Sequence, residues 1–238
     1  MPDFVFNILK LAGVDTSLIK SINKRTQFKN VIIPENSIQY IESKGRFYFQ
    51  EYYETIELIK INCTNIPTKT YQKVYFSRTA LNQKGRDFGE KKLELNFKKH
   101  GYTIIYPEKI PLEQHINIAA NCGCLAATES SASHHSVFCK PNTKMILLQK
   151  SNYVNTYSLM VNDVSGVEAI YVTAHQTITK KYPWMGPFYM NVTKYVGALF
   201  NEKDHCNRWF DIEWYNYLHS VISTKLQFIK KLLRTQKH

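Results

Sequence analysis

The chain has 238 residues, of which 44% are hydrophobic and 13% aromatic, and this is enough apolar material for a folded core. No stretch reaches the roughly 18–20 uninterrupted apolar residues of a membrane-spanning helix. The first residues, Met-Pro-Asp-Phe, lack the basic patch and apolar run of a secretory signal. Wholesale disorder and a membrane span are excluded, and we expect a soluble, cytosolic protein.

The formal net charge of +12 indicates an anionic partner, for which nucleic acid, an anionic membrane and a phosphorylated small molecule are the candidates. The basic residues are spread along the chain, and no recognised nucleic-acid-binding motif occurs. We therefore expect no nucleic-acid partner. The five cysteines are odd in number and irregularly spaced, which argues against a disulfide framework.

The first 66 residues are predicted to form a small N-terminal region. In chain order we expect a helix over residues 4–12, a short helix capped by Asp15 or Thr16, a buried strand over 31–34 that ends at Pro34, and an amphipathic helix over 46–61. The stretch 65–68, Asn-Ile-Pro-Thr, is predicted to be a linker. It separates this region from a domain over residues 67–180.

Strand and helix patterns alternate regularly within 67–180. Strands are expected over 74–77, 102–106, 124–128, 144–149 and 169–173, and helices over 90–100, 112–121, 131–138 and 155–161. Such alternation indicates βαβ units, so the fold class is α/β with a Rossmann-like, mainly parallel sheet.

Residues 181–238 are expected to form a C-terminal helical extension, with helices near 190–200 and 208–235. The terminal helix ends in Ile-Lys-Lys-Leu-Leu-Arg and is both basic and amphipathic. Two interpretations remain open. The helix packs back on the sheet with its lysines in water, or it makes peripheral contact with an anionic membrane.

Three cations follow the first strand of the α/β domain. Arg78 stands at the strand end, and Lys84 and Arg86 lie in the loop after it. A guanidinium at the carboxyl end of a parallel strand suits bidentate contact with a diphosphate. An ordinary solvated loop is the alternative.

A small-residue turn, Thr-Glu-Ser-Ser-Ala-Ser, follows the predicted strand 124–128. Small residues there let backbone N–H groups approach an anion, and the hydroxyls of Ser131 and Ser133 add donors. Glu129 would then face a sugar or ribose hydroxyl. The serines can equally cap the next helix without any ligand.

His134 and His135 follow this turn. One imidazole can orient a phosphate or act as a base, and since adjacent helical residues point about 100° apart, we expect the other to be structural. The cysteine and histidine spacings match no common zinc pattern, so no metal is predicted. A serine hydrolase is also disfavoured, because no G-x-S-x-G motif occurs.

Taken in order, these residues resemble glycosyltransferase family 61, in the form found among bacterial capsular-polysaccharide enzymes. The resemblance covers roughly residues 28–150. It rests on VYFSR at 74–78, Arg86 and Glu90, YPE at 106–108, Glu113-Gln114, and ESSASHHSVF at 129–138 followed by KPNTKMILL. Relatives often carry Asn-Glu where this chain has Gly89-Glu90, and many carry Gly-Ser or His-Gly at the turn that here contains Glu129.

The resemblance implies a GT-B-like architecture and inverting transfer from a nucleotide sugar, UDP-linked, to a glycan or lipid-linked glycan acceptor, with no cofactor and no essential metal. Arg78, Lys84, Arg86, Ser131 and Ser133 would bind the donor phosphates. Glu129 or His134 would be the catalytic base, and Glu90, Glu108 and Glu113 would organise the site.

Family members usually carry a longer N-terminal portion, so the first 66 residues are expected to be the remnant of the acceptor-side half. The alternative function is a catalytically incomplete module that binds nucleotide or glycan, or that partners another transferase. Under either function we expect a cytoplasmic protein, at the inner face of the membrane if the terminal helix docks there.

Overall fold

The computed structural model describes residues 3–41, 43–64, 69–81, 87–178, 186–202 and 211–235. The predicted linker 65–68, the boundary near residue 180, and both Lys84 and Arg86 lie outside these ranges.

Five parallel strands form the central sheet: β3 (Lys73–Phe76), β5 (Thr103–Ile105), β6 (Cys124–Thr128), β7 (Lys144–Gln149) and β8 (Glu168–Thr173). Their order across the sheet is β5-β3-β6-β7-β8, and every neighbouring pair is parallel. The chain moves outward from β3 to β5 and then returns to the other side of β3 with β6. This arrangement confirms the Rossmann-like α/β prediction. It also creates a topological switch point between β3 and β6, where such sheets hold their ligands.

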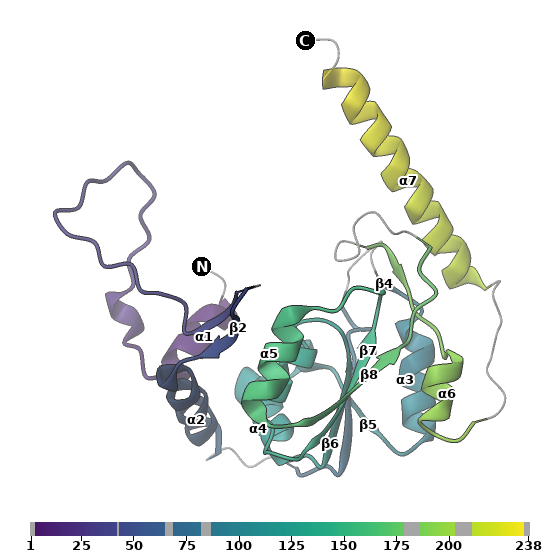
Figure 1. The fold of residues 1–238 in the computed structure, drawn as a ribbon, viewed down its shortest axis with the longest axis horizontal. Coiled ribbons are helices and arrows are strands. Elements are labelled where there is room, and N and C mark those ends of the chain that lie inside the picture. Colours follow the sequence, from purple (N-terminus) through teal and green to yellow (C-terminus); the bar gives the residue numbers. More distant parts are fainter. Residues whose placement is uncertain are drawn as a thin grey trace.

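Helices cover both faces of this sheet (Figure 1). On one face lie α4 (Leu112–Asn121), α5 (Thr156–Ser165) and the 3₁₀ helix η3 (Ser133–Phe138), and on the other lie α3 (Glu90–Lys99) and α6 (Lys194–Ala198). Alternate side chains of each strand enter the two cores. Val74 and Phe76 of β3 pack in the α4 core, whereas Tyr75 packs with Leu93 and Phe97 of α3. Burial on both faces explains why these strands are almost continuously apolar.

The N-terminal region contains α1 (Asp3–Leu11), the 3₁₀ helix η1 (Thr16–Leu18), a hairpin of β1 (Ile38–Ile41) and β2 (Gly45–Tyr48), and α2 (Gln50–Thr64). The predicted cap is confirmed, because the Asp15 side chain accepts a hydrogen bond from the Ser17 N–H at 2.9 Å. The hairpin was not predicted.

Two expectations for this region are wrong. Residues 31–34 form no strand, and Ile32 and Ile33 are 93% and 85% exposed, because no described segment offers them a pairing edge. The helix expected from residue 46 begins only at Gln50, since Gly45, with φ of +93°, turns the chain so that β2 pairs back on β1.

The N-terminal region packs on the α4 side of the α/β domain. Ile59 and Cys63 of α2 are buried in the same core as Ile116 of α4. The hairpin is tied to α5 by an ion pair between Arg46 and Asp163, and the Tyr48 hydroxyl donates to Asp163 at 3.2 Å. α2 and the β1–β2 hairpin therefore lie on the side of the sheet opposite to α3.

The C-terminal part begins with β9 (Phe188–Tyr189), which pairs in parallel with β4 (Asp87–Phe88). The first turns of α7 (Ile212–Thr235) pack on this two-stranded sheet, where Trp214, Tyr217 and Val221 surround Tyr189. The rest of α7 projects away from the body (Figure 1). Among the described residues, no helix is both long and apolar enough to cross a bilayer.

Gly89 joins β4 to α3 with a left-handed backbone, φ of +84°. Asparagine is one of the few other residues that adopt this conformation. In this chain, however, a Cβ at residue 89 would lie 1.9 Å from the backbone oxygen of Met190. Only glycine fits the contact between β4 and the segment after β9.

We predict that Gly89→Ala costs clearly more stability than Gly101→Ala. Gly101 has almost the same φ, +82°, but no atom lies within 4 Å of a Cβ built there. Backbone strain alone, roughly 1–2 kcal/mol, therefore applies to Gly101→Ala, whereas Gly89→Ala must also displace the Met190 backbone. Urea unfolding of both variants measures the difference, and equal losses would contradict the close packing at Gly89.

Candidate functional site

The carboxyl ends of three adjacent strands place polar side chains at the switch point. Arg78 is the second residue after β3, Glu129 directly follows β6, and Lys150 directly follows β7. Because parallel strands end at the same edge of the sheet, residues 78, 129 and 150 come together although they are far apart in the chain.

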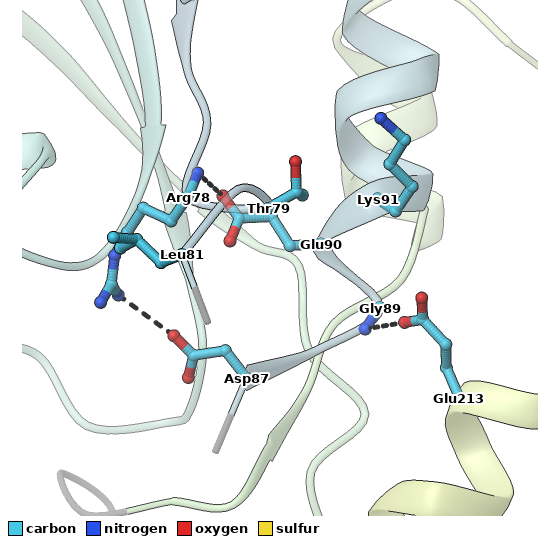
Figure 2. A pocket seen from close by; sticks show the side chains of 8 residues that line it. All are labelled: Arg78, Thr79, Leu81, Asp87, Gly89, Glu90, Lys91 and Glu213. Carbon is cyan, nitrogen blue, oxygen red and sulfur yellow. Dashed lines mark hydrogen bonds and ion pairs between the residues drawn. The ribbon is translucent and has the colours of Figure 1, made fainter. Parts of the chain in front are cut away.

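Two hollows open at this edge, and Arg78 lines both. The first measures about 290 Å³ and is lined by Arg78, Thr79, Leu81, Asp87, Gly89, Glu90, Lys91 and Glu213 (Figure 2). The second measures about 260 Å³ and is lined by Arg78, Glu129, Ser130, Ser131, His134, Lys150, Ser151, Tyr153, Asn155 and Phe188. Each is close to the roughly 300 Å³ at the lower end of small-molecule sites.

Asp87 holds two cations beside these hollows. Its Oδ2 lies 3.1 Å from Nη1 of Arg78 and 3.2 Å from Nζ of Lys150. All three side chains are 12–13% exposed, so the interactions are only weakly screened by water. Two positive charges share this one carboxylate, and the same two cations line the second hollow together with the Glu129 carboxyl group.

Glu90, the first residue of α3, ties the two strands of the switch point together. Its Oε1 accepts hydrogen bonds from the Arg78 N–H at 3.2 Å, and from the hydroxyls of Tyr75 and Thr128 at 3.3 Å each. Burial raises the pKa of Glu90 to about 7, although the Arg78 N–H favours the charged form. The organising role that the resemblance implied for Glu90 stays a prediction.

Glu94, one turn along α3, anchors the segment after β3. It accepts hydrogen bonds from the Ser77 hydroxyl at 2.8 Å and the Tyr106 hydroxyl at 3.1 Å, and also from Thr79 and Lys91. Burial disfavours the carboxylate, but the hydrogen bonds outweigh it and lower the pKa of Glu94. Two neighbouring carboxyl groups on one helix therefore have pKa values shifted in opposite directions.

The serine turn is closed by its own side chains. The Ser133 hydroxyl is buried, donates to the Ser130 carbonyl at 2.7 Å and accepts from the Ser130 N–H at 3.2 Å. Ser131 is exposed and lines the second hollow. Of the two serines predicted to bind phosphate, Ser131 is thus open to a ligand, whereas the Ser133 hydroxyl is engaged within the turn.

Glu129 and His134, the two predicted candidates for the base, both line the second hollow. Oε1 of Glu129 accepts a hydrogen bond from the Asn155 N–H at 3.1 Å, and burial raises the pKa of Glu129. Nε2 of His134 lies 3.3 Å from the Ser158 hydroxyl, and burial lowers the pKa of His134. Near neutral pH the imidazole is therefore uncharged, and its second nitrogen can accept a proton.

His135 points to the other side of the turn, as expected for adjacent helical residues. Its ring lies edge-on to Phe76 and 4.6 Å from His115, and burial lowers its pKa to about 4. In the part of the chain that the structure describes, no three histidine, cysteine or acidic side chains gather as a metal site would need.

Glu108 and Glu113 line neither hollow. Glu108 is exposed in the 3₁₀ helix η2 (Pro107–Lys109). Glu113 lies in the first turn of α4, where its charge acts on Cys63 of α2. Their organising role stays a prediction, because no contact among the described residues tests it.

Sequence reasoning missed Asp87, Lys150 and Glu213. Lys150 had a usable signal, because it directly follows a predicted parallel strand just as Arg78 does. Asp87 had none, since its role depends on both cations. Glu213 reaches the site from α7, where its carboxylate accepts a hydrogen bond from the Gly89 N–H (Figure 2).

We predict that Glu90→Gln removes a pH-dependent contribution to stability. The pKa of Glu90 is about 7 in the folded protein against an ordinary 4.5, so its stabilising effect is fully present below pH 4.5 and is lost as the pH rises through 7. Relative to the wild type, Glu90→Gln should gain about 3 kcal/mol between pH 4.5 and 8.

Urea unfolding across this pH range measures the effect, with Glu94→Gln as a control whose profile should run parallel to that of the wild type above pH 4.5. The pKa of Glu94 is lowered, so its contribution is present above the ordinary pKa and is lost as the pH falls through the folded value. Parallel pH profiles for the wild type and Glu90→Gln would contradict the raised pKa.

Comparison with known proteins identifies the family. The family model described as Glycosyltransferase 61 matches residues 5–146, more than half of the chain. The match includes Arg78, Glu90, Glu129 and His134, whereas Lys150 lies beyond it. A search of curated proteins finds no match. With its Rossmann-like sheet and its polar switch point, this chain belongs to glycosyltransferase family 61.

Proposed function

We propose that this protein transfers a sugar from a UDP-linked nucleotide-sugar donor to a glycan or lipid-linked glycan acceptor. The reaction inverts the configuration at the anomeric carbon and needs no essential metal. It serves capsule or surface polysaccharide biosynthesis. Family membership supports a glycosyltransferase in general. The observation that carries the donor assignment is the pair of cations, Arg78 and Lys150, that Asp87 holds beside the second hollow.

The second hollow suits a nucleoside diphosphate. The two cations on its wall come from the ends of β3 and β7, and Ser131 adds a hydroxyl donor. The aromatic rings of Tyr153 and Phe188 also line it and offer surfaces for a base or a sugar. Asp87 holds both cations in position before a ligand arrives. A bound diphosphate would then compete with the Asp87 carboxylate for them.

In the proposed step, the acceptor hydroxyl oxygen attacks the anomeric carbon and the bond to the diphosphate breaks on the opposite face. The leaving nucleoside diphosphate carries away the bonding electron pair, and Arg78 and Lys150 stabilise the negative charge that develops on it. The hydroxyl proton passes to a base. Glu129 and His134 are our two candidates, because both line the hollow, and burial raises the pKa of Glu129 and lowers that of His134.

We propose a cytoplasmic location for this reaction. The four cysteines that the structure describes, Cys63, Cys122, Cys124 and Cys139, are all buried free thiols. Unpaired thiols are typical of a reducing compartment, which supports this location.

Arg78→Ala should weaken UDP binding about tenfold to hundredfold, the loss expected for charge-assisted hydrogen bonds of roughly 1.5–3 kcal/mol. Isothermal titration calorimetry with UDP and a panel of nucleotide sugars measures it. Arg25→Ala, which removes an exposed arginine that lines neither hollow, is the matched control. No UDP binding by the wild type, or equal binding by Arg78→Ala, would overturn the donor site. UDP binding without any turnover would instead favour the incomplete binding module.

Glu129→Gln and His134→Gln distinguish the two candidate bases. Replacing the base should lower kcat/KM for UDP release from the donor by roughly 10²–10⁴ and should abolish its rise with pH. Replacing the other residue should leave the rise of kcat/KM with pH in place. The midpoint of that rise should lie above pH 4.5 if the base is Glu129 and below pH 6.5 if the base is His134. Glutamine at 129 keeps an oxygen for the Asn155 N–H, so the fold is preserved. A profile unchanged in both variants would exclude both residues.

A further inference from the structure

Only the first part of α7 is covered by the rest of the protein. Trp214, Tyr217 and Val221 are 8%, 0% and 9% exposed, whereas Ile222 and Leu226 are 57% and 53% exposed. The helix continues to Thr235 and projects away from the body (Figure 1). The apolar face that packs at its start therefore runs on without a covering element among the described residues.

The sequence of α7 has an amphipathic period. At about 100° per residue, the apolar positions 214, 215, 218, 221, 222, 226, 228, 229, 232 and 233 group on one side of the sequence pattern, with Lys225 among them. The polar positions 216, 220, 223, 227, 230, 231 and 234 group on the other side. The start of the apolar side is used against Tyr189, and Ile222 and Leu226 on its continuation are exposed.

The same segment is strongly basic. From Trp214 to His238 the sequence contains no acidic residue, and it contains five basic ones: Lys225, Lys230, Lys231, Arg234 and Lys237. A partner that covers this helix must therefore be apolar where it meets Ile222 and Leu226, and negatively charged beside them.

These two requirements separate the candidate partners. A second copy of α7 would cover the apolar face but would place like charges together with no acid to neutralise them. Nucleic acid would neutralise the lysines but would leave the apolar side chains in water. The surface of an anionic bilayer meets both needs, because acyl chains accept the apolar face and headgroups attract the basic one.

We propose that the distal part of α7, from Ile222 to Thr235, lies in the headgroup region of an anionic membrane and holds the protein there without crossing the bilayer. This inference stands on the helix itself and does not require the proposed sugar transfer.

The base of α7 is firmly joined to the switch point. Glu213 accepts a hydrogen bond from the Gly89 N–H, and Asp211 pairs with Lys92 of α3. Gly89 is two residues from Asp87, which holds Arg78 and Lys150. Membrane docking would thus fix the height of the two hollows above the bilayer. If the proposed function is correct, the acceptor class that this arrangement favours is a glycan carried on a lipid.

Vesicle co-sedimentation of the full chain tests the docking. We expect binding to phosphatidylcholine vesicles that contain phosphatidylglycerol, weakened by salt, and little binding to phosphatidylcholine alone. The double variant Ile222→Ser with Leu226→Ser should bind at least tenfold more weakly, and so should Lys230→Gln with Lys231→Gln. Leu95→Ser with Ile170→Ser is the control, because these side chains are similarly exposed, 55% and 47%, on α3 and β8.

Undiminished vesicle binding by the Ile222 and Leu226 variant, or equal binding to neutral vesicles, would overturn the proposal. So would a dimer that forms without vesicles and is lost in that variant, because the partner would then be a second copy. Calorimetry with UDP on the wild type and the same variant separates this inference from the proposed function. If UDP binds but the wild type does not bind vesicles, only the docking is overturned. If the wild type binds vesicles but UDP does not bind, only the donor site is overturned.

Discussion

The Asp87 carboxylate, buried between Arg78 and Lys150, is the interaction on which the rest of the site depends. Two cations from the ends of β3 and β7 would repel each other at this distance, and each has lost most of its contact with water. One shared carboxylate holds both cations in place beside the second hollow, which they line together with Glu129. A dianionic ligand can therefore bind to a site whose charges are already in position.

Asp87 in turn depends on the segment around it. It belongs to β4, which pairs with β9, and the next residues lead through Gly89 into α3. Glu90 then connects this turn to the ends of β3 and β6 through Arg78 and Thr128. The central sheet thus supplies the edge, and β9 from the C-terminal part pairs with β4, which carries the Asp87 carboxylate.

The C-terminal part therefore has two roles in one structure. Its β9 and the base of α7 complete the switch point, and the distal part of α7 presents an uncovered, basic and apolar surface. Because Glu213 and Asp211 join the two, the position of α7 and the position of the hollows cannot vary independently. A docking helix of this kind would orient the site as well as localise it.

The sequence alone determined the elements whose cause is local. Apolar strands, capped helices and the small-residue turn follow from neighbouring residues, so the α/β class, Arg78 at a strand end, and Glu129 and His134 after β6 were predictable. The pattern failed at 31–34 and 45–48, because a strand needs a pairing edge that its own residues do not specify. Only the tertiary structure brought Asp87, Lys150 and Glu213 to the switch point. These three come from distant segments, and their roles arise from charges and hydrogen bonds that exist only once the sheet and α7 have packed together.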